Sequence, residues 1–147
     1  MPIPPDLPPI YFEVRGILLQ KICGFKLEDL VSELPDNPIA WEEIIQSAVN
    51  AAKEINRAGV IHGEFLPWNI VVARLDEHTF QPFILGFSDS AVKWELEDTD
   101  PIDETGEHNM HSFRLQVHMA HDPDTVGFFM VRDVEKATGY KLRVNYD

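Results

Sequence analysis

The sequence predicts an α+β fold that is mainly helical and carries short β-hairpins. The first observation is an amphipathic stripe over residues 38–57, where apolar residues recur at helical spacing. The second is a pair of short apolar runs, residues 70–73 and 82–87, separated by a polar turn. A second helical pattern starts at Asp122-Pro123. Together these patterns indicate a helix, a loop, a hairpin and a further helix.

Both helices have start and stop signals. Asn37 is a favourable N-cap, Pro38 suits the first helical position, and Gly59 supplies a C-terminal stop. In the second helix, Asp122-Pro123 is expected to provide the N-cap and a first-turn proline, and Gly139 ends the helix. The stripe that we expect to face the core of the first helix is Trp41, Ile44, Ile45, Ala48, Ala52 and Ile55.

The chain divides into an N-terminal arm and one domain. Residues 1–9 contain five prolines and are predicted to be an extended arm, and residues 10–147 are predicted to form a single domain. Within the domain, residues 10–22 are expected to form two short strands that turn near Arg15-Gly16. Residues 25–34 place leucines at helical spacing.

Two further segments follow from composition and alternation. Residues 95–109 are acidic and rich in turn-forming residues, which predicts a mobile acidic loop. Residues 140–146 alternate apolar and polar side chains, as an edge strand does.

The charge of the chain excludes several classes of partner. It has 25 acidic residues against 12 basic ones, a formal charge of −13. Such a surface repels nucleic acid and anionic lipid, so neither nucleic acid nor a membrane is expected as a partner. Cys23 is the only cysteine, so a thiolate metal cluster is excluded. With no secretory signal and no run of about 18 apolar residues, a cytoplasmic location is expected.

One loop carries a resemblance to a known family. Residues 59–72, GVIHGEFLPWNIVV, resemble the catalytic loop of protein kinases, H-R-D-L-x-x-x-N. His62 matches the histidine, Glu64 stands in place of the catalytic aspartate, and Asn69 matches the metal-binding asparagine at the same spacing. The segment follows a long helix and precedes a hairpin, as it does in kinases. The rival interpretation is an unrelated α+β domain, and pairing of residues 70–73 with 82–87 distinguishes the two.

Other segments extend the resemblance. Residues 83–91, FILGFSDSA, resemble the strand and turn that hold the kinase D-F-G motif, with Gly86 at the aspartate position. Residues 16–30 resemble the kinase hinge and its following helix. Residues 121–146 are similar to the end of small fungal proteins that consist of a half-kinase. The resemblance implies a protein-kinase-like C-lobe fragment with no complete N-lobe, because fewer than twenty residues precede the hinge-like segment.

Phosphoryl transfer is not expected from these residues. Gly86 offers no carboxylate, and Asn69 alone would hold Mg²⁺ poorly. The extra methylene of Glu64 displaces its carboxylate by more than about 1 Å, a misplacement that can cost on the order of 10²-fold. Asp89 is a candidate replacement acid, although it lies three positions after Gly86. We therefore expect neither ATP nor a metal as cofactor.

Two functions remain open at this stage. The first is a non-phosphorylating protein that binds an apolar small molecule or a protein partner at the former catalytic cleft, with a homo-oligomer also compatible. The second is a fungal secondary-metabolism enzyme, a cyclase or isomerase such as a pericyclic one, in which Glu64 or Asp89 is catalytic. His62 is expected to be structural. The candidate ligand-binding residues are Phe65, Trp68, Asn69, Phe87 and Trp94.

A group of histidines was considered for metal binding. If residues 107–121 were helical, His111, His118 and His121 would share a sector of about 80°. The segment lacks an H-E-x-x-H pattern, and the acidic loop beside it argues against a helix over that whole range. No metal site is predicted.

Overall fold

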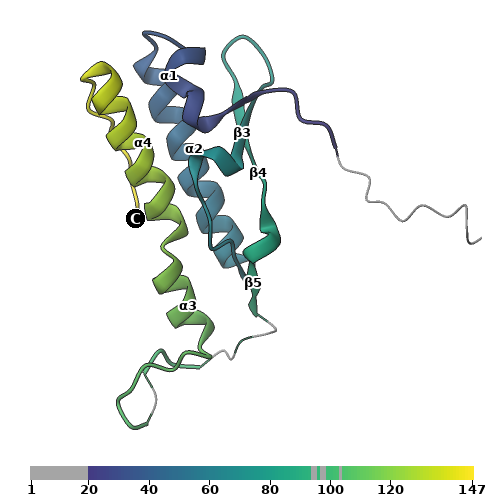
Figure 1. The fold of residues 1–147 in the computed structure, drawn as a ribbon, viewed down its shortest axis with the longest axis vertical. Coiled ribbons are helices and arrows are strands. Elements are labelled where there is room, and N and C mark those ends of the chain that lie inside the picture. The colour runs from purple at the N-terminus through teal and green to yellow at the C-terminus, as the bar shows by residue number, and fades with distance from the viewer. Residues whose placement is uncertain (1–19, 94–95, 97–98, 103) are drawn as a thin grey trace, which may run out of the picture.

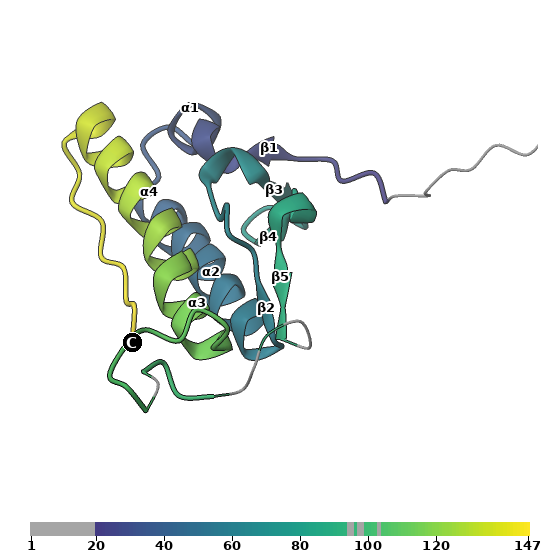
Figure 2. The same ribbon diagram turned by 60° about the horizontal axis from the view of Figure 1, so that its bottom comes forward.

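The computed structural model describes residues 20–93, 96, 99–102 and 104–147. The predicted arm and most of the predicted strand pair at residues 10–22 lie outside this part of the chain. Among the described residues, two long helices run side by side, α2 (Pro38–Arg57) and α4 (Asp122–Thr138), as Figures 1 and 2 show. Strand β4 (Phe80–Ile84) packs against α2 as well, so α2 is the central element of the core.

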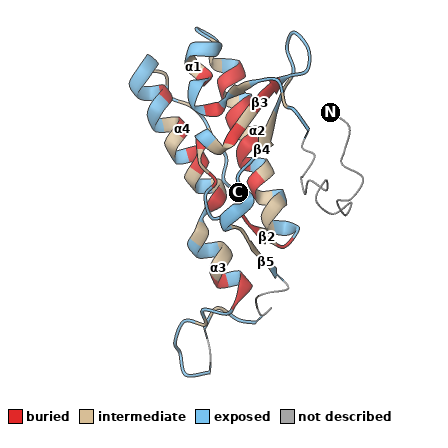
Figure 3. Ribbon diagram, turned by 45° about the vertical axis from the view of Figure 1, so that its right-hand side comes forward, coloured by how far each residue is buried: buried red, intermediate tan, exposed pale blue. Residues whose placement is uncertain are grey.

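The long predicted helix is confirmed with the predicted bounds. The Asn37 side chain accepts a hydrogen bond from the Ala40 amide at 3.2 Å, and Pro38 is the first helical residue. The predicted stripe is buried from Trp41 to Ala52, whereas Ile55 is only partly buried. Ile55 lies in the last turn of α2 and packs against the edge of the core, so the predicted face is confirmed. Figure 3 shows the buried residues gathered on α2 and the elements beside it.

The predicted hairpin is also confirmed, although its second strand starts two residues earlier than expected and ends at Ile84, so Phe87 lies outside it. Strand β3 (Ile70–Arg74) pairs antiparallel with β4, with Val71 opposite Phe83, and the short strand β1 (Phe25–Lys26) pairs with the other edge of β3. Gly24 allows this close approach, because a Cβ atom there would lie 2.2 Å from the Val72 carbonyl oxygen. The strand pairing that distinguishes a kinase-like fold from an unrelated α+β domain is therefore present.

A second small sheet lies beside the loop that contains His62, Glu64 and Asn69. Strand β2 (Val60–Ile61) pairs antiparallel with β5 (Ala91–Val92), with Val60 opposite Val92. The Lys93 amide also donates to the Gly59 carbonyl oxygen at 2.7 Å. Strand β2 directly precedes the loop that contains His62, and β5 directly follows the turn that contains Phe87. Their pairing therefore holds residues 59–72 and 83–91, the two segments that resemble kinase motifs, together.

The segment after β1 is helical, as its leucine spacing predicts. It consists of a 3₁₀ turn, η2 (Leu27–Asp29), and one α-turn, α1 (Leu30–Glu33). Leu27 and Leu30 are fully buried in the core. The indole nitrogen of Trp41 donates to the Leu34 carbonyl oxygen at 2.8 Å, which fixes the segment on the helix.

The C-terminal region differs from expectation in two ways. Helix α4 begins at Asp122 itself, with His121 as the cap residue in the left-handed region, so Asp122 is not the N-cap. The predicted strand at residues 140–146 is absent, because its neighbour is a helix that has no strand edge to pair with. Instead, side chains of α2 bind its backbone: Gln46 accepts from the Asn145 amide at 2.8 Å and donates to its carbonyl oxygen at 2.9 Å.

Helix α3 (Phe113–Ala120) precedes α4 and follows the described part of the acidic loop. Its N-cap is Ser112, whose hydroxyl is 3.4 Å from the Leu115 amide. None of the described helices is long and apolar enough to cross a membrane.

Asp76, in the turn between β3 and β4, is expected to stabilise the fold in a way that is lost at acidic pH. The Asp76 carboxylate accepts hydrogen bonds from the amides of His78 at 2.9 Å and Thr79 at 2.8 Å, and these bonds, that of His78 foremost, lower the pKa of Asp76 below its usual 3.8. A carboxyl with a lowered folded-state pKa stabilises fully above its unfolded pKa and loses this effect as pH falls through the folded value. Thermal melts across acidic pH should therefore show a steeper loss for the wild type than for Asp76→Asn. Parallel curves below pH 3.8 would contradict this role.

Candidate functional site

The kinase-like loop joins β2 to β3 and is held by its own backbone. The Leu66 amide donates to the Glu64 carbonyl oxygen at 2.8 Å, and the Asn69 side-chain amide donates to the same oxygen at 3.0 Å. The Asn69 backbone amide in turn donates to Leu66 at 2.9 Å, closing the 3₁₀ turn η3 (Pro67–Asn69). The loop is therefore a defined platform on which the Glu64 and Trp68 side chains are exposed.

His62 lies beneath this loop and is fully buried. Its Nε2 is 2.8 Å from the Leu85 carbonyl oxygen, so Nε2 carries the proton and donates. Its Nδ1 accepts from the Glu64 amide at 3.3 Å. The rings of Phe65 and Phe87 contact the imidazole edge-on, at centroid distances of 5.3 and 4.7 Å. Both ring nitrogens of His62 are therefore hydrogen-bonded and two phenylalanine rings pack against the imidazole, an arrangement compatible with the expected structural role, which stays a prediction.

A buried carboxylate that the sequence analysis did not assign to the site also holds the loop. Asp122 is 1% exposed and accepts hydrogen bonds from the backbone amides of His62 at 2.8 Å and Gly63 at 3.1 Å. Its Oδ2 also accepts from the Asn56 side chain at 3.2 Å. Asp122 therefore ties the start of α4 and the end of α2 to the loop. Its Asp-Pro context has the pattern of a helix cap, which concealed this role.

The two kinase-like segments meet at Asn69 and Gly86. The Leu85 amide donates to the Asn69 carbonyl oxygen at 2.8 Å. A Cβ atom built on Gly86 would lie 3.3 Å from both Cγ and Oδ1 of Asn69. The position that holds a carboxylate in the kinase motif therefore faces Asn69, but here it is glycine with a φ of +79°. Position 86 is therefore adjacent to the Asn69 side chain, as the resemblance implies, but it carries no carboxylate.

Both candidate catalytic carboxylates are exposed at the loop. Asp89 ends the 3₁₀ turn η4 (Phe87–Asp89), where its Oδ2 accepts from the Ser88 hydroxyl at 3.1 Å. A Cβ atom on Gly63 would lie 3.2 Å from the Asp89 carbonyl oxygen, so this turn passes directly beside the loop that carries Glu64. Their catalytic roles remain predictions.

The candidate aromatic residues separate into distinct environments. Phe65 is 1% exposed and belongs to the core, so it supports the loop from below and offers no surface for a ligand. Phe87 is 46% exposed and also contacts the His62 ring. Trp68 is 45% exposed and faces α4, where its ring lies 6.3 Å from that of Phe129. Trp94 lies outside the described residues.

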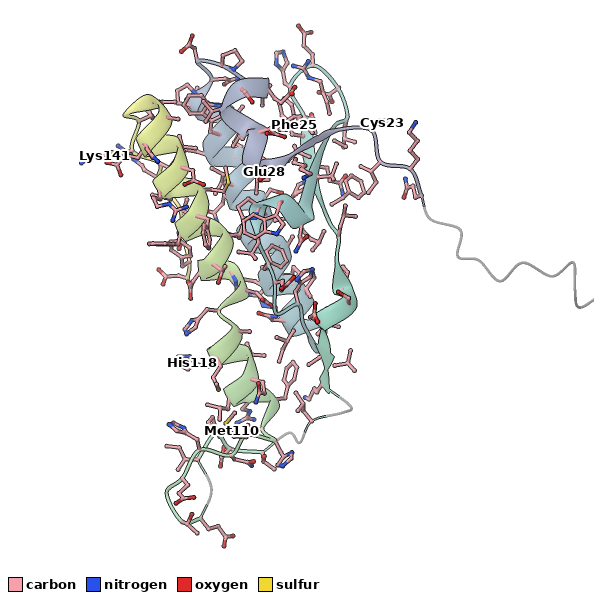
Figure 4. The ribbon with its side chains drawn as sticks, viewed as in Figure 1. Cys23, Phe25, Glu28, Met110, His118 and Lys141 are labelled. Atoms are coloured by element: carbon pink, nitrogen blue, oxygen red, sulfur yellow. The ribbon has the colours of Figure 1, made fainter. Side chains whose placement is uncertain are left out.

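The histidine segment does not form one helix. Helix α3 starts at Phe113, so His111 precedes it, and the shared helical sector considered for three histidines does not exist. The His118 and His121 rings are 5.0 Å apart, and the His118 side chain points away from α3 (Figure 4). His121 Nδ1 lies 3.2 Å from the Asp124 carboxylate. Within the described residues, no group of three or more His, Cys, Asp or Glu side chains is arranged to hold a metal ion.

A comparison with solved structures shows that this chain has a protein-kinase-like fold. No family model matches the sequence, and no curated protein matches it. Among solved structures, the chain is similar to the Rio2 kinase of Chaetomium thermophilum, in a complex with ADP/Mg²⁺ and phosphoaspartate, with a TM-score of 0.52 and 16% sequence identity. The match covers 85% of this chain and 31% of the Rio2 chain, so the likeness spans about a third of that kinase and concerns the fold.

Proposed function

We propose that this chain is a kinase-fold-derived domain that transfers no phosphate and binds a protein partner at the surface of its former catalytic loop. The observation that carries the proposal is Trp68: a large aromatic side chain that is 45% exposed on a loop whose backbone is fully organised. An organised exposed tryptophan provides contact area at low entropic cost, which is why tryptophan is enriched at binding hot spots.

The arrangement of Asn69 and Gly86 argues against phosphoryl transfer. Phosphoryl transfer depends on metal ions that neutralise the developing charge, and Mg²⁺ in such sites is held through carboxylates. Gly86 supplies none, and Asn69 would contribute only a neutral amide oxygen. With a formal charge of −13, the chain also repels polyphosphate.

Binding is favoured over the cyclase or isomerase alternative by the position of Phe65. Such an enzyme would hold an apolar substrate in an enclosed site beside a carboxylate, and Phe65, which was expected to line that site, is in the core. Grooves of about 440 Å³ along α2 and of about 310 Å³ between α2 and α3 are lined by neither Glu64 nor Trp68. Glu64 and Trp68 are both exposed, and an exposed surface suits a protein partner better than a small molecule.

A paired titration tests the proposal. Calorimetry with Mg²⁺-ATP should give no dissociation constant below about 100 µM, which corresponds to roughly −5.5 kcal/mol. Nile red fluoresces on exposed apolar surface, so it reports whether the surface around Trp68 is accessible to a partner. Its signal with the wild type should fall in Trp68→Ala, because the exposed aromatic side chain is removed. Glu64→Gln keeps the shape of the loop and should leave Nile red binding unchanged.

The outcomes separate the alternatives. A dissociation constant for Mg²⁺-ATP below about 100 µM would contradict the proposal that the chain transfers no phosphate. Nile red binding that Trp68→Ala leaves unchanged, in a protein whose circular dichroism shows it folded, would remove Trp68 as the binding residue. If the wild type isomerises or cyclises a substrate, and a folded Glu64→Gln variant turns it over about 10²–10⁴ times more slowly, the cyclase or isomerase alternative is favoured.

A further inference from the structure

The C-terminal segment, residues 140–147, lies on the outside of the two long helices. From Gly139 it runs back beside α4, as Figure 2 shows. Tyr140, Leu142 and Val144 pack against the core, but none of the eight residues, all of which the structure describes, is buried. Helix α4, by contrast, has a face of fully buried residues. Detaching the segment would therefore uncover much less apolar surface than detaching α4.

Two side chains of α2 bind the backbone of this segment. Glu42 accepts hydrogen bonds from the Arg143 backbone amide at 3.0 Å and from the Tyr140 hydroxyl at 3.1 Å. Gln46 accepts from the Asn145 amide at 2.8 Å and donates to the Asn145 carbonyl oxygen at 2.9 Å. Four residues of a helix rise about 6.0 Å and two extended residues span about 6.6 Å, so the two contacts keep step. Because they engage backbone groups, another extended segment can form them.

Gly127 makes a recess for the aromatic ring of the segment. It is buried in the interior of α4, where glycine is less favourable than alanine. A Cβ atom built on Gly127 would lie 2.5 Å from Cε1 of Tyr146, so a larger residue here would push the ring away. With Leu142, Val144 and Tyr146 at alternate positions, the groove accepts an apolar side chain at every second residue and an aromatic ring beside Gly127.

We propose that the groove between α2 and α4 binds an extended segment of a protein partner with apolar side chains at alternate positions, and that the C-terminal segment is an internal occupant that the partner displaces. This site goes beyond the proposed function, because its contacts come from Glu42, Gln46 and Gly127 rather than from the kinase-like loop. It also gives a role to the alternation in residues 140–146, which forms no strand in this fold.

The internal segment leaves part of the groove empty. A space of about 440 Å³ beside it is lined by Glu43, Ser47 and Asn50 of α2 and by Arg143 of the segment. The internal segment competes at an effective concentration that is roughly millimolar, because it is tethered to the same chain. A partner therefore needs additional contacts to displace it, and this space along α2 can provide them.

A second copy of this chain is a poorer source of the incoming segment. Its residues 140–147 would make the same contacts as the segment that they displace and gain none. Each copy also carries a formal charge of −13, so two copies repel each other. A different protein is therefore the favoured partner.

The test uses a fluorescein-labelled peptide with the sequence of residues 140–147, titrated against the whole chain and followed by anisotropy. The wild type should bind this peptide weakly, because its own segment occupies the groove. Tyr146→Ala loosens the internal segment and leaves the groove intact, so this variant should bind the peptide about tenfold more tightly. Ile39→Ala removes an apolar side chain that is 70% exposed in the first turn of α2 and should bind the peptide as the wild type does.

Gly127→Ala tests the recess from the other side. Added to the Tyr146→Ala chain, it should weaken peptide binding about tenfold, because the tyrosine of the peptide no longer fits beside α4. A peptide with alanine in place of that tyrosine should bind the single and the double variant equally. Alanine is a better helix former than glycine, so α4 is expected to stay folded, and circular dichroism checks this.

Displacement should be visible in the internal segment itself. Saturating unlabelled peptide should accelerate hydrogen exchange of the Arg143 and Asn145 amides in the isotope-labelled wild type, because Glu42 and Gln46 then bind the peptide instead. If the peptide binds and this exchange stays unchanged, the peptide lies elsewhere and the inference fails.

The remaining outcomes are equally decisive. Equal affinity of the wild type and Tyr146→Ala for the peptide, or no effect of adding Gly127→Ala, would overturn the inference. A wild-type dimer that Gly127→Ala dissociates in sedimentation would assign the groove to a second copy and overturn the choice of partner. A Nile red signal that falls in Trp68→Ala, without any peptide binding, would leave the proposed function standing and overturn this inference alone.

Discussion

Replacing Asp122 with alanine is expected to lower the free energy of unfolding by about 3–5 kcal/mol. The carboxylate is 1% exposed and receives hydrogen bonds from two backbone amides, those of His62 and Gly63, and from the Asn56 side chain. Removing it leaves the buried His62 amide and the part-buried Gly63 amide without an acceptor, and each unpaired buried donor costs about 1–3 kcal/mol. For a chain of this size, the melting temperature should fall by roughly 10 °C.

The effect should also be visible in the loop itself. Hydrogen exchange of the His62 and Gly63 amides should accelerate in Asp122→Ala more than exchange at the centre of α2, because the lost bonds are local. Asp122→Asn is the matched variant: it keeps one accepting oxygen and places an NH₂ group against backbone N–H donors, so an intermediate loss is expected. A cost below about 1 kcal/mol for Asp122→Ala would show that the loop does not depend on this carboxylate.

The second large effect is expected for Phe65→Ala, at about 3–5 kcal/mol. The ring is fully enclosed between the loop and the core and contacts His62 edge-on at 5.3 Å. Its removal leaves a cavity and withdraws one of the two rings that hold the imidazole. Denaturant unfolding followed by circular dichroism measures the loss.

Phe87→Ala provides the matched control, because the same residue type contacts the same imidazole from the exposed side at 4.7 Å. Its loss should be about 1 kcal/mol or less, since nearly half of the ring is already in water. If Phe65→Ala instead cost little stability and weakened Nile red binding, Phe65 would line a ligand site after all.

The local elements of this protein follow from the sequence alone. The bounds of α2 are set by Asn37, Pro38 and Gly59, whose capping preferences act within one or two turns of the backbone. The hairpin of β3 and β4 follows from two apolar runs and a turn that Asp76 closes by bonding its own neighbours. The spacing of His62, Glu64 and Asn69 also indicated the kinase-like loop, because that motif is contiguous in the chain. Each of these signals lies within a few residues of the structure that it determines.

Only the tertiary structure shows which side chains of the site support the loop from the core and which are exposed on its surface. Phe65 and Trp68 are neighbours in one loop, yet Phe65 is buried against His62 and Trp68 faces α4. Asp122 and His62 are 60 residues apart, and their hydrogen bond exists only because α4 packs on α2. The strand expected at residues 140–146 became a segment bound by α2, since alternation of side chains does not specify the neighbour that satisfies the backbone. Burial and partnership depend on contacts between distant segments, and no local pattern contains that information.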